Sequence, residues 1–200
     1  MFYAVNIDKI TDNIYVSNGP TAENEFYLKV HNFSIVINTA SDLSEYFKKK
    51  INEYNDNLDR EIIPYTISIN LNPLKNSNYK SPFFTKPVVN PFITIKNEMS
   101  SHSKQIKYYD FGIKDNETTN LRPKMYIIAR LINYYIIKYP NTKILVNCCM
   151  GLSRSVSMVA GYLILYKHMK PQQAIDFIKK KRKNAFTNPY FVEQLKKVKS

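Results

Sequence analysis

The chain has 200 residues, a length that fits one domain, and 44% of them are hydrophobic, which is enough for a sizeable core. Its formal net charge of +13 favours polyanionic partners, although a composition rich in Lys, Asn, Ile and Tyr also fits the coding of an AT-rich genome. The two cysteines are adjacent in the chain, which argues against a disulfide-stapled scaffold and suits a reducing compartment.

Hydrophobic periodicity predicts alternating strands and helices in the first 71 residues. We expect strands over residues 10–16, 34–38 and 62–71. A helix capped by Thr21 should follow the first strand, and a charged helix over residues 43–58 should follow the second. The helix after Thr21 would carry the apolar residues Ala22, Phe26, Leu28 and Val30.

From residue 72 to 103 the chain changes character, because four prolines interrupt a stretch rich in Asn, Ser and Lys. A structureless loop of this length is uncommon inside a compact domain, so we predict an insertion over residues 72–103. Two interpretations stay open, a lid or partner-binding loop and a tolerated surface insertion, and we favour the second.

Beyond the insertion we expect strands over residues 106–113 and 144–146, with a helix between them that has Pro123 near its first turn. An apolar helix from Val156 to His168, a helix that starts at Pro171 and a last short helix around Phe191 should complete the chain. This alternation predicts an α/β fold with a central, mostly parallel sheet flanked by helices on both faces, in one domain over residues 1–200.

No basic segment followed by an apolar one opens the sequence, and no apolar run reaches about 18 residues, so we expect no membrane span and a cytoplasmic location. The three histidines have no cysteine or carboxylate at ligand spacing, so we expect no metal and no cofactor. The sequence does not indicate the oligomeric state.

The most informative stretch is a strand, a short loop and a helix N-terminus between Ile144 and Leu165. Unpaired N–H groups and the positive end of the helix dipole meet at such a junction, so it binds anions. Cys148 enters the loop and Arg154 leaves it, with five residues between them. The helix N-terminus and the arginine favour a thiolate, and a guanidinium can grip two phosphate oxygens. Gly151 permits a positive φ or a close backbone approach in so tight a turn.

This arrangement predicts hydrolysis of phosphate monoesters through a cysteinyl-phosphate intermediate. The residues expected to bind the phosphate are those of the loop itself, Cys149, Met150, Gly151, Leu152, Ser153 and Arg154.

The stretch from Cys148 to Ser155 resembles the Cys-x5-Arg-Ser/Thr signature of the cysteine-dependent protein tyrosine phosphatases, in their dual-specificity branch. Residues 10–18 and 35–40 resemble that branch's opening and central strands, and residues 188–195 resemble its closing helix. The likeness covers nearly the whole chain except the expected insertion. The chain is also similar to the small poxvirus dual-specificity phosphatases. A protist origin is equally open.

The resemblance implies a protein tyrosine phosphatase-like fold and a metal-independent enzyme that acts on phosphotyrosine and phosphoserine or phosphothreonine in proteins. A viral source would place it in the host-cell cytoplasm or the virion. The lysines around Arg182 also fit nuclear entry, although a solvated helix face is the simpler interpretation.

The family also uses an Asp about thirty residues before the cysteine as general acid, and Asp115 lies 33 residues before Cys148. Asp110 is the competitor, but it falls inside an expected strand. The same Asp would later activate the water that hydrolyses the intermediate. Ser155 matches the hydroxyl that stabilises the departing thiolate in the family.

Asn147 departs from the family pattern, which usually has His before the nucleophile. An Asn side chain can donate a similar hydrogen bond but has no titrating ring. We therefore expect an active enzyme with a less strongly activated Cys148.

Arg182 aligns with a family arginine that can bind a second phosphate near the mouth of the site, so we expect it to contact substrate. For Cys149 we weigh two roles, a neighbour that traps an oxidised Cys148 and a buried loop thiol, and we favour the second because a vicinal disulfide is strained.

Two other functions stay open. The positive charge would suit an RNA 5′-phosphatase, but the loop ending Gly-Leu-Ser-Arg-Ser resembles the protein-directed branch. The departure at Asn147 would suit a catalytically weak module that binds phosphoproteins. We favour the enzyme with a phosphoprotein substrate over both.

Overall fold

The computed structural model describes residues 5–56 and 105–199. All of them belong to one of the two compact units into which the chain divides, residues 1–57 together with 104–200. The expected strand over residues 62–71 and the expected insertion over residues 72–103 lie outside the described residues. The single domain over residues 1–200 therefore stays a prediction.

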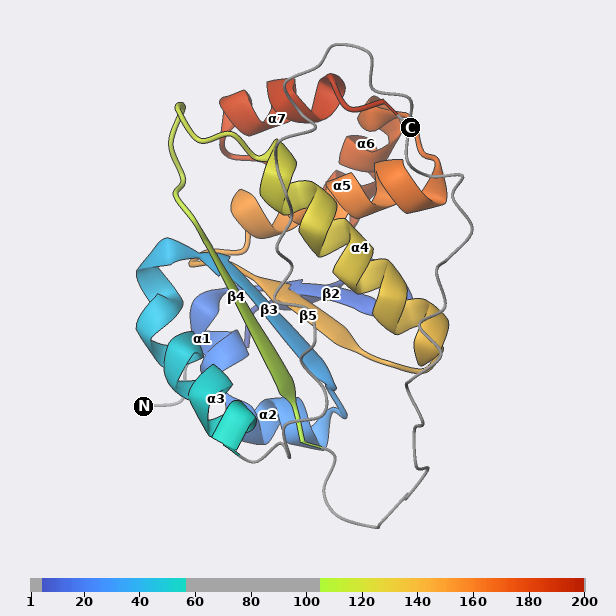
Figure 1. The fold of residues 1–200 in the computed structure, drawn as a ribbon. Helices are drawn as coiled ribbons and strands as arrows, with labels where there is room; N and C mark the ends of the chain where they lie inside the picture. The colour runs from blue at the N-terminus through green and yellow to red at the C-terminus, as the bar shows by residue number, and fades with distance from the viewer. Residues whose placement is uncertain (1–4, 57–104, 200) are drawn as a thin grey trace, which may run out of the picture. The chain divides into compact units, whose positions relative to one another are not determined.

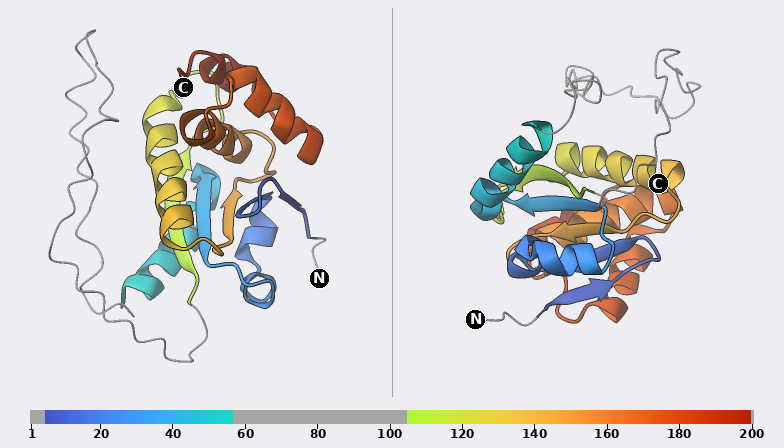
Figure 2. Two further views of the ribbon diagram at one scale, coloured as in Figure 1. Left: turned by 90° about the vertical axis from the view of Figure 1, so that its right-hand side faces the viewer. Right: turned by 90° about the horizontal axis from the view of Figure 1, so that it is seen from below.

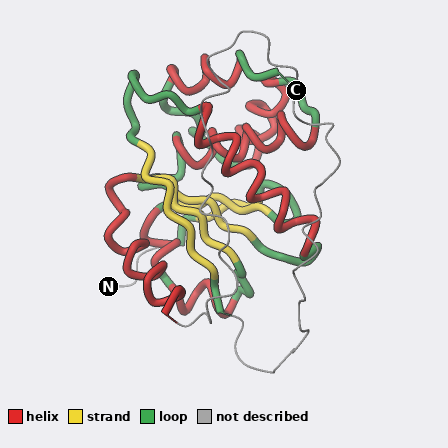
Figure 3. Tube along the Cα trace, in the orientation of Figure 1, coloured by secondary structure: helices red, strands yellow, loops and turns green. Residues whose placement is uncertain are grey.

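A five-stranded sheet forms the centre of the described unit (Figures 1 and 3). Its strands lie in the order β1-β2-β5-β3-β4, with β1 antiparallel to β2 and every other neighbouring pair parallel. The strands are β1 (Ile7–Lys9), β2 (Ile14–Ser17), β3 (Ile35–Ala40), β4 (Lys107–Ile113) and β5 (Ile144–Asn147). The mostly parallel sheet that the sequence predicts is confirmed.

Helices cover both faces of this sheet (Figure 2). On one face lie α1 (Gly19–Glu23), α2 (Glu25–Val30) and α3 (Ser44–Asp56), with the short 3-10 helix η1 (Ser41–Leu43) before α3. On the other face α5 (Arg154–Lys167) lies against the strands, and around it pack α4 (Arg122–Lys138), α6 (Pro171–Lys181) and α7 (Pro189–Lys196). Among the described residues, no helix combines the length and the apolar character that a bilayer span needs.

The alternation of side chains along β5 shows why the sheet is covered twice. Ile144 and Val146 enter the larger hydrophobic core under α4 and α5, whereas Leu145 enters the smaller core under α2 and α3. Because successive strand residues point to opposite faces, a central strand made only of apolar residues needs cover on both sides.

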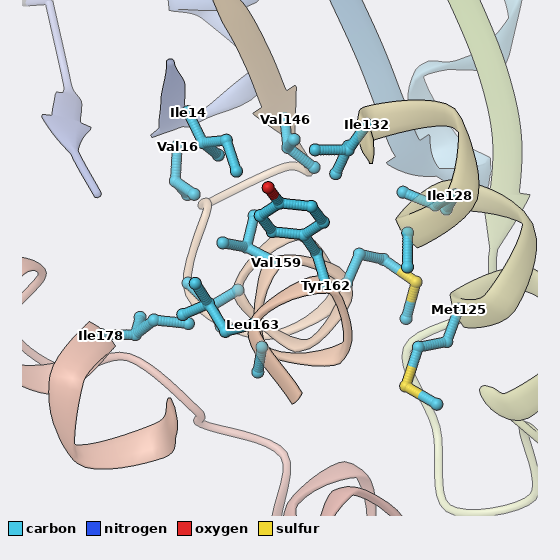
Figure 4. Close-up of a cluster of buried hydrophobic side chains, with 14 of the residues drawn as sticks. Ile14, Val16, Met125, Ile128, Ile132, Val146, Val159, Tyr162, Leu163 and Ile178 are labelled. Carbon is cyan, nitrogen blue, oxygen red and sulfur yellow. The ribbon is translucent and has the colours of Figure 1, made fainter. Parts of the chain in front are cut away.

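The larger core brings α4 close to α5 at a glycine. A Cβ atom on Gly161 of α5 would lie 2.3 Å from Cγ of Met125, so a residue with a side chain would require the Met125 side chain to move. The neighbouring Tyr162 lies in the middle of the core cluster between the strands and α4 (Figure 4).

The segment around Thr21 differs from the single helix that we expect there, and the expected cap at Thr21 is wrong, because α1 begins at Gly19 and Asn18 is its N-cap. Asn24 ends α1 and caps α2, with its Oδ1 accepting from the Tyr27 N–H at 3.0 Å. This side-chain bond offers the backbone an alternative to helix continuation. Leu28 is buried, but Phe26 is 79% exposed and Val30 is 58% exposed.

The carboxyl ends of the parallel strands position the functional loops. Cys148 follows β5, Asp42 lies just beyond β3 and Asp115 lies just beyond β4. Ligands of open α/β sheets bind beyond this edge, because the strands deliver their connecting loops to one place.

Candidate active site

The loop from Cys148 to Ser153 joins β5 to α5 and holds the Cys148 sulfur at its centre. The residue is only 1% exposed. Its Sγ accepts the Gly151 N–H at 3.2 Å and lies 3.3 Å from the Ser155 hydroxyl oxygen. The positive end of the α5 helix dipole faces this loop. The first turn of α5 contains no acidic side chain that would offset it.

Gly151 is required by the path of this loop. Its φ is +70°, in the left-handed region, and a Cβ atom there would lie 2.5 Å from the Ser17 carbonyl oxygen. Both the turn and the approach to β2 therefore exclude a side chain. The sequence predicts a positive φ or a close backbone approach at Gly151, but it does not show that Ser17 is the neighbouring residue.

Arg182 supports the loop from beneath. Its Nε donates to the Gly151 carbonyl at 2.6 Å and its Nη2 donates to the Met150 carbonyl at 3.0 Å. Its remaining contacts reach the N-terminal segment, to Asp8 at 2.7 Å and to Asn6 at 2.7 Å.

The Arg182 side chain is only 3% exposed, and protein atoms accept from four of its five N–H groups. The expectation was an arginine at the mouth of the site that contacts a second phosphate. The structure instead places this guanidinium under the loop, where it binds backbone carbonyls.

Arg154 is the first residue of α5 and lies between two carboxylates. Its Nη1 donates to Asp42 Oδ1 at 2.7 Å and to the Ile113 carbonyl at 3.2 Å, and its Nε lies 3.3 Å from Asp115 Oδ2. Burial by itself lowers the pKa of Arg154, but the neighbouring anionic groups raise the pKa above its ordinary value, so the side chain is a cation.

Asp42 is the site residue that the sequence reasoning missed. It accepts from Arg154 and also from the Cys149 thiol. Partial burial raises the pKa of Asp42, but these two hydrogen bonds, together with a backbone hydrogen bond and the charge of Arg154, outweigh it and hold the pKa below its ordinary value. The available clue was its place just after a parallel strand that ends beside the Cys loop.

Asp115 comes closer to the anion site than Asp110 does. Asp115 Oδ1 accepts from the Ser153 hydroxyl and from Asn188 Nδ2, each at 2.8 Å, while Oδ2 faces Arg154. Asp110 remains on β4, where its carboxylate accepts from Asn38 at 2.8 Å. The position of Asp115 suits an acid that acts on a bound phosphate ester.

Asn147 is fully buried beneath the nucleophile. Its Nδ2 donates to Asn38 Oδ1 at 3.1 Å, and Asn38 in turn donates to Asp110. The Thr39 hydroxyl donates to the Asn147 carbonyl at 2.7 Å, which fixes the end of β5 just before Cys148. A chain of neutral amides therefore lies where the family resemblance leads one to expect an imidazole.

The remaining loop residues divide between buried and exposed. Cys149 is half-buried and not the buried thiol that we expect. Its partial burial, and then the hydrogen bond to Asp42, raise the pKa of Cys149 to about 11, so this thiol stays protonated near neutral pH. Ser153 is buried and Met150 is 64% exposed at the surface of the loop. In the part of the chain that the structure describes, no three His, Cys, Asp or Glu side chains gather as a metal site would need.

The geometry thus brings together residues from widely separated parts of the chain. Cys148 lies beside Ser155, and Arg154 lies beside Asp115, at the N-terminus of α5. Residues 76–200 match the family described as dual specificity phosphatase, catalytic domain. The chain belongs to this family.

Sequence relatives of this phosphatase-family chain include viral and animal proteins. One is a protein of Invertebrate iridescent virus 6 whose name describes a tyrosine phosphatase, 36% identical over 84 residues, which are 42% of this chain and 58% of the relative. Another is the protein phosphatase Slingshot of Drosophila melanogaster, 35% identical over 89 residues, which are 44% of this chain and 8% of the relative. The matches therefore cover less than two thirds of these relatives.

Solved structures of dual specificity phosphatases share the fold. Human DUSP28 superposes with a TM-score of 0.60 at 12% identity, covering 98% of this chain and 93% of that one. The human tyrosine phosphatase-like serine/threonine/tyrosine-interacting protein gives 0.59 at 15% identity, covering 95% and 93%. The predicted family branch and fold class are confirmed, and at these identities the structures speak to the fold alone.

Proposed function

We propose that this chain hydrolyses phosphotyrosine and phosphoserine or phosphothreonine in proteins through a cysteinyl-phosphate intermediate. The observation that carries the proposal is the buried Cys148 sulfur, which accepts the Gly151 N–H, in a loop that leads to Arg154, whose guanidinium lies 3.3 Å from Asp115. Membership of the dual specificity phosphatase family supports it.

In the first step, the substrate phosphate would enter the loop against its N–H groups and the N-terminus of α5. The Cys148 thiolate attacks phosphorus while the bond to the leaving oxygen breaks. Asp115 gives its proton to that oxygen and becomes a carboxylate, a contribution worth roughly 10²–10⁴-fold for a positioned acid.

In the second step, the same carboxylate takes a proton from a water whose oxygen attacks phosphorus. The sulfur–phosphorus bond breaks, and inorganic phosphate and the Cys148 thiolate are released. The Ser155 hydroxyl, 3.3 Å from Sγ, would donate to the departing thiolate.

Arg154 would bind two equatorial phosphate oxygens through its guanidinium edge and stabilise the charge of both transition states. Asp42 holds the Nη1 end of that guanidinium at 2.7 Å and so orients it toward the loop. We assign no metal or cofactor to either step.

The amides of Asn147 and Asn38 take the structural place of the family's ring. The Asn147 side chain donates to Asn38 and carries no charge between pH 5 and 8, while the Thr39 hydroxyl holds the Asn147 carbonyl. We keep the expectation of activity as part of the proposal. A nucleophilic cysteine also needs reducing conditions, and we therefore propose a cytoplasmic location.

The test compares wild type with Cys148→Ser on an aryl phosphate, a phosphopeptide and a 5′-triphosphorylated RNA. We expect turnover of the first two by wild type, and its loss to background in the variant. Cys149 cannot substitute, because a thiol with a pKa of about 11 is protonated at the assay pH.

Each other result contradicts the proposal. Turnover that depends on Cys148 with the RNA alone would identify an RNA 5′-phosphatase. Phosphopeptide binding without turnover of any substrate would identify a binding module. A phosphatase activity that persists in Cys148→Ser would show that the nucleophile is another group.

A further inference from the structure

The acid loop, residues 114–121 between β4 and α4, is attached to α7 at several points. Asn188 donates to Asp115, Gln194 Oε1 accepts from the Leu121 N–H at 2.8 Å, and Gln194 Nε2 donates to the Thr119 carbonyl at 2.8 Å. A helix from the C-terminal end of the chain thus fixes both the carboxylate and the backbone of this loop.

Asn188 has two functions at this junction. Its Oδ1 accepts the Tyr190 N–H at 3.0 Å and so caps α7, while its Nδ2 donates to Asp115 Oδ1 at 2.8 Å. Because the cap fixes the amide plane, the direction of the N–H toward Asp115 is also fixed. The rigid helix determines where the carboxylate lies.

The two oxygens of Asp115 consequently differ. Oδ1 accepts from both Asn188 and the Ser153 hydroxyl, so a proton on Oδ1 would oppose two donors. Oδ2 lies 3.3 Å from Arg154 Nε, a contact that a bound phosphate oxygen would replace. The proton that is given to the leaving group therefore belongs on Oδ2, which faces the anion site.

We propose that Asn188 is a positioning residue for the general acid: it engages Oδ1 of Asp115, so that Oδ2 carries the proton and points at the leaving oxygen. The inference rests on the proposed phosphatase function. In the first step the proton moves from Oδ2 to the leaving oxygen as the phosphorus–oxygen bond breaks. In the second step Oδ2 recovers a proton from the attacking water.

The test uses aryl phosphates whose leaving groups differ in basicity. A poor leaving group such as phenolate needs the acid, whereas a good one such as 2,4-dinitrophenolate does not. We expect Asn188→Ser to lower kcat/KM on phenyl phosphate by about 10–100-fold, since a small misplacement of a catalytic group has effects of this order. On 2,4-dinitrophenyl phosphate kcat/KM of the variant should stay within about 2-fold of wild type, because kcat/KM reports only the steps up to cleavage of the phosphorus–oxygen bond.

Asn188→Ser is chosen because serine retains an N-cap acceptor for α7 but is too short to reach Asp115. A second variant, Asn188→Asp, keeps the shape and the cap but replaces the donor with a carboxylate beside Oδ1. Repulsion between two carboxylates disfavours ionisation of the pair, so the limb of the kcat–pH profile assigned to Asp115 should move to higher pH.

The double variant Asp115→Asn with Asn188→Ser supplies the decisive comparison. If Asn188 acts through Asp115, its substitution has no further effect on phenyl phosphate once the acid is absent. Equal losses on both aryl phosphates, or additive losses in the double variant, would overturn the inference. Turnover by wild type that is lost in Cys148→Ser tests the phosphatase function separately. If it is present, a negative result with the Asn188 variants contradicts only the role of Asn188.

Discussion

Arg182 is the residue on which the shape of the loop from Cys148 to Ser153 depends. It links the Gly151 and Met150 carbonyls to Asp8, and it is almost completely buried. Removing it would leave two loop carbonyls and a carboxylate without their donor. Breaking a buried ion pair by deleting one partner costs about 3–5 kcal/mol, and the partial exposure of Asp8 places this pair at about 2–4 kcal/mol.

We therefore predict that Arg182→Ala lowers the free energy of unfolding by that amount and reduces kcat/KM equally on an aryl phosphate and on a doubly phosphorylated peptide. Urea unfolding and parallel kinetics measure the two effects. Arg182→Lys keeps the charge beside Asp8 and should remain folded, with the same equal loss of activity. The exposed neighbour Lys181 provides the control, Lys181→Ala, which should behave as wild type.

A loss confined to the doubly phosphorylated peptide would contradict this role. It would restore the sequence-based expectation that Arg182 contacts a second phosphate.

At the scale of residues, sequence predicts what is local. Cys148, Gly151 and Arg154 lie in one loop, so spacing alone shows that they meet. The contacts of Asp42 and Asn188 join segments more than 70 residues apart, and no local pattern encodes them. Alignment predicts that Arg182 contacts a second phosphate at the mouth of the site, because the charge of a residue does not show that its side chain is buried.

At the scale of elements, α5 both presents Arg154 and forms the centre of the core. Tyr162 of this helix directs its hydroxyl toward Ile14, Val16 and Val146 (Figure 4), and that hydroxyl has no hydrogen-bond partner among the described residues. Burial raises the pKa of Tyr162 to about 12, which reflects an apolar setting for the oxygen. An unpaired buried hydroxyl destabilises the native state.

We predict that Tyr162→Phe raises the free energy of unfolding by about 1 kcal/mol, because the substitution removes the unpaired oxygen and keeps the ring. For a chain of this size the midpoint of thermal unfolding should rise by about 2–4 °C. Activity on an aryl phosphate should not change.

Tyr109→Phe is the matched control, since the Tyr109 hydroxyl is hydrogen-bonded to Tyr135. Its loss should destabilise the protein. Equal effects of the two substitutions would show that the Tyr162 hydroxyl is not unpaired in solution.

The predicted elements correspond to the observed ones where periodicity is strong, as in α4 and α5. They differ where a backbone turn or a short polar side chain redirects the chain. Ile10 donates its N–H to the Ile14 carbonyl at 2.8 Å in a tight turn, so β2 begins at Ile14 rather than at Ile10. Asn24 similarly divides one expected helix into two.

At the scale of the whole molecule, the fold follows from alternating strands and helices, and the site follows from the shared edge of the parallel strands. The formal charge of +13 is a further property of the whole chain, and sequence leaves two explanations for it. Part of this charge lies in the exposed lysines around Arg182. The segment that follows these lysines contacts the loop from Cys148 to Ser153, because the Phe186 N–H donates to the Leu152 carbonyl at 2.6 Å. The lysines are therefore near the loop that would receive substrate.

If this charge attracts substrate, kcat/KM should depend on ionic strength more steeply for a phosphopeptide with acidic flanks than for the same phosphopeptide with neutral flanks. Between about 0.01 M and 0.15 M salt the Debye length falls from about 30 Å to about 8 Å, which removes most long-range attraction. We expect about a 10-fold decrease for the acidic peptide and about a 2-fold decrease for the neutral one, since steering of this kind raises association rates by 10-fold or more. A positive charge that attracts acidic partners must act more strongly on the acidic peptide than on the neutral one. Identical salt dependence for the two peptides would therefore assign the lysine content to coding composition.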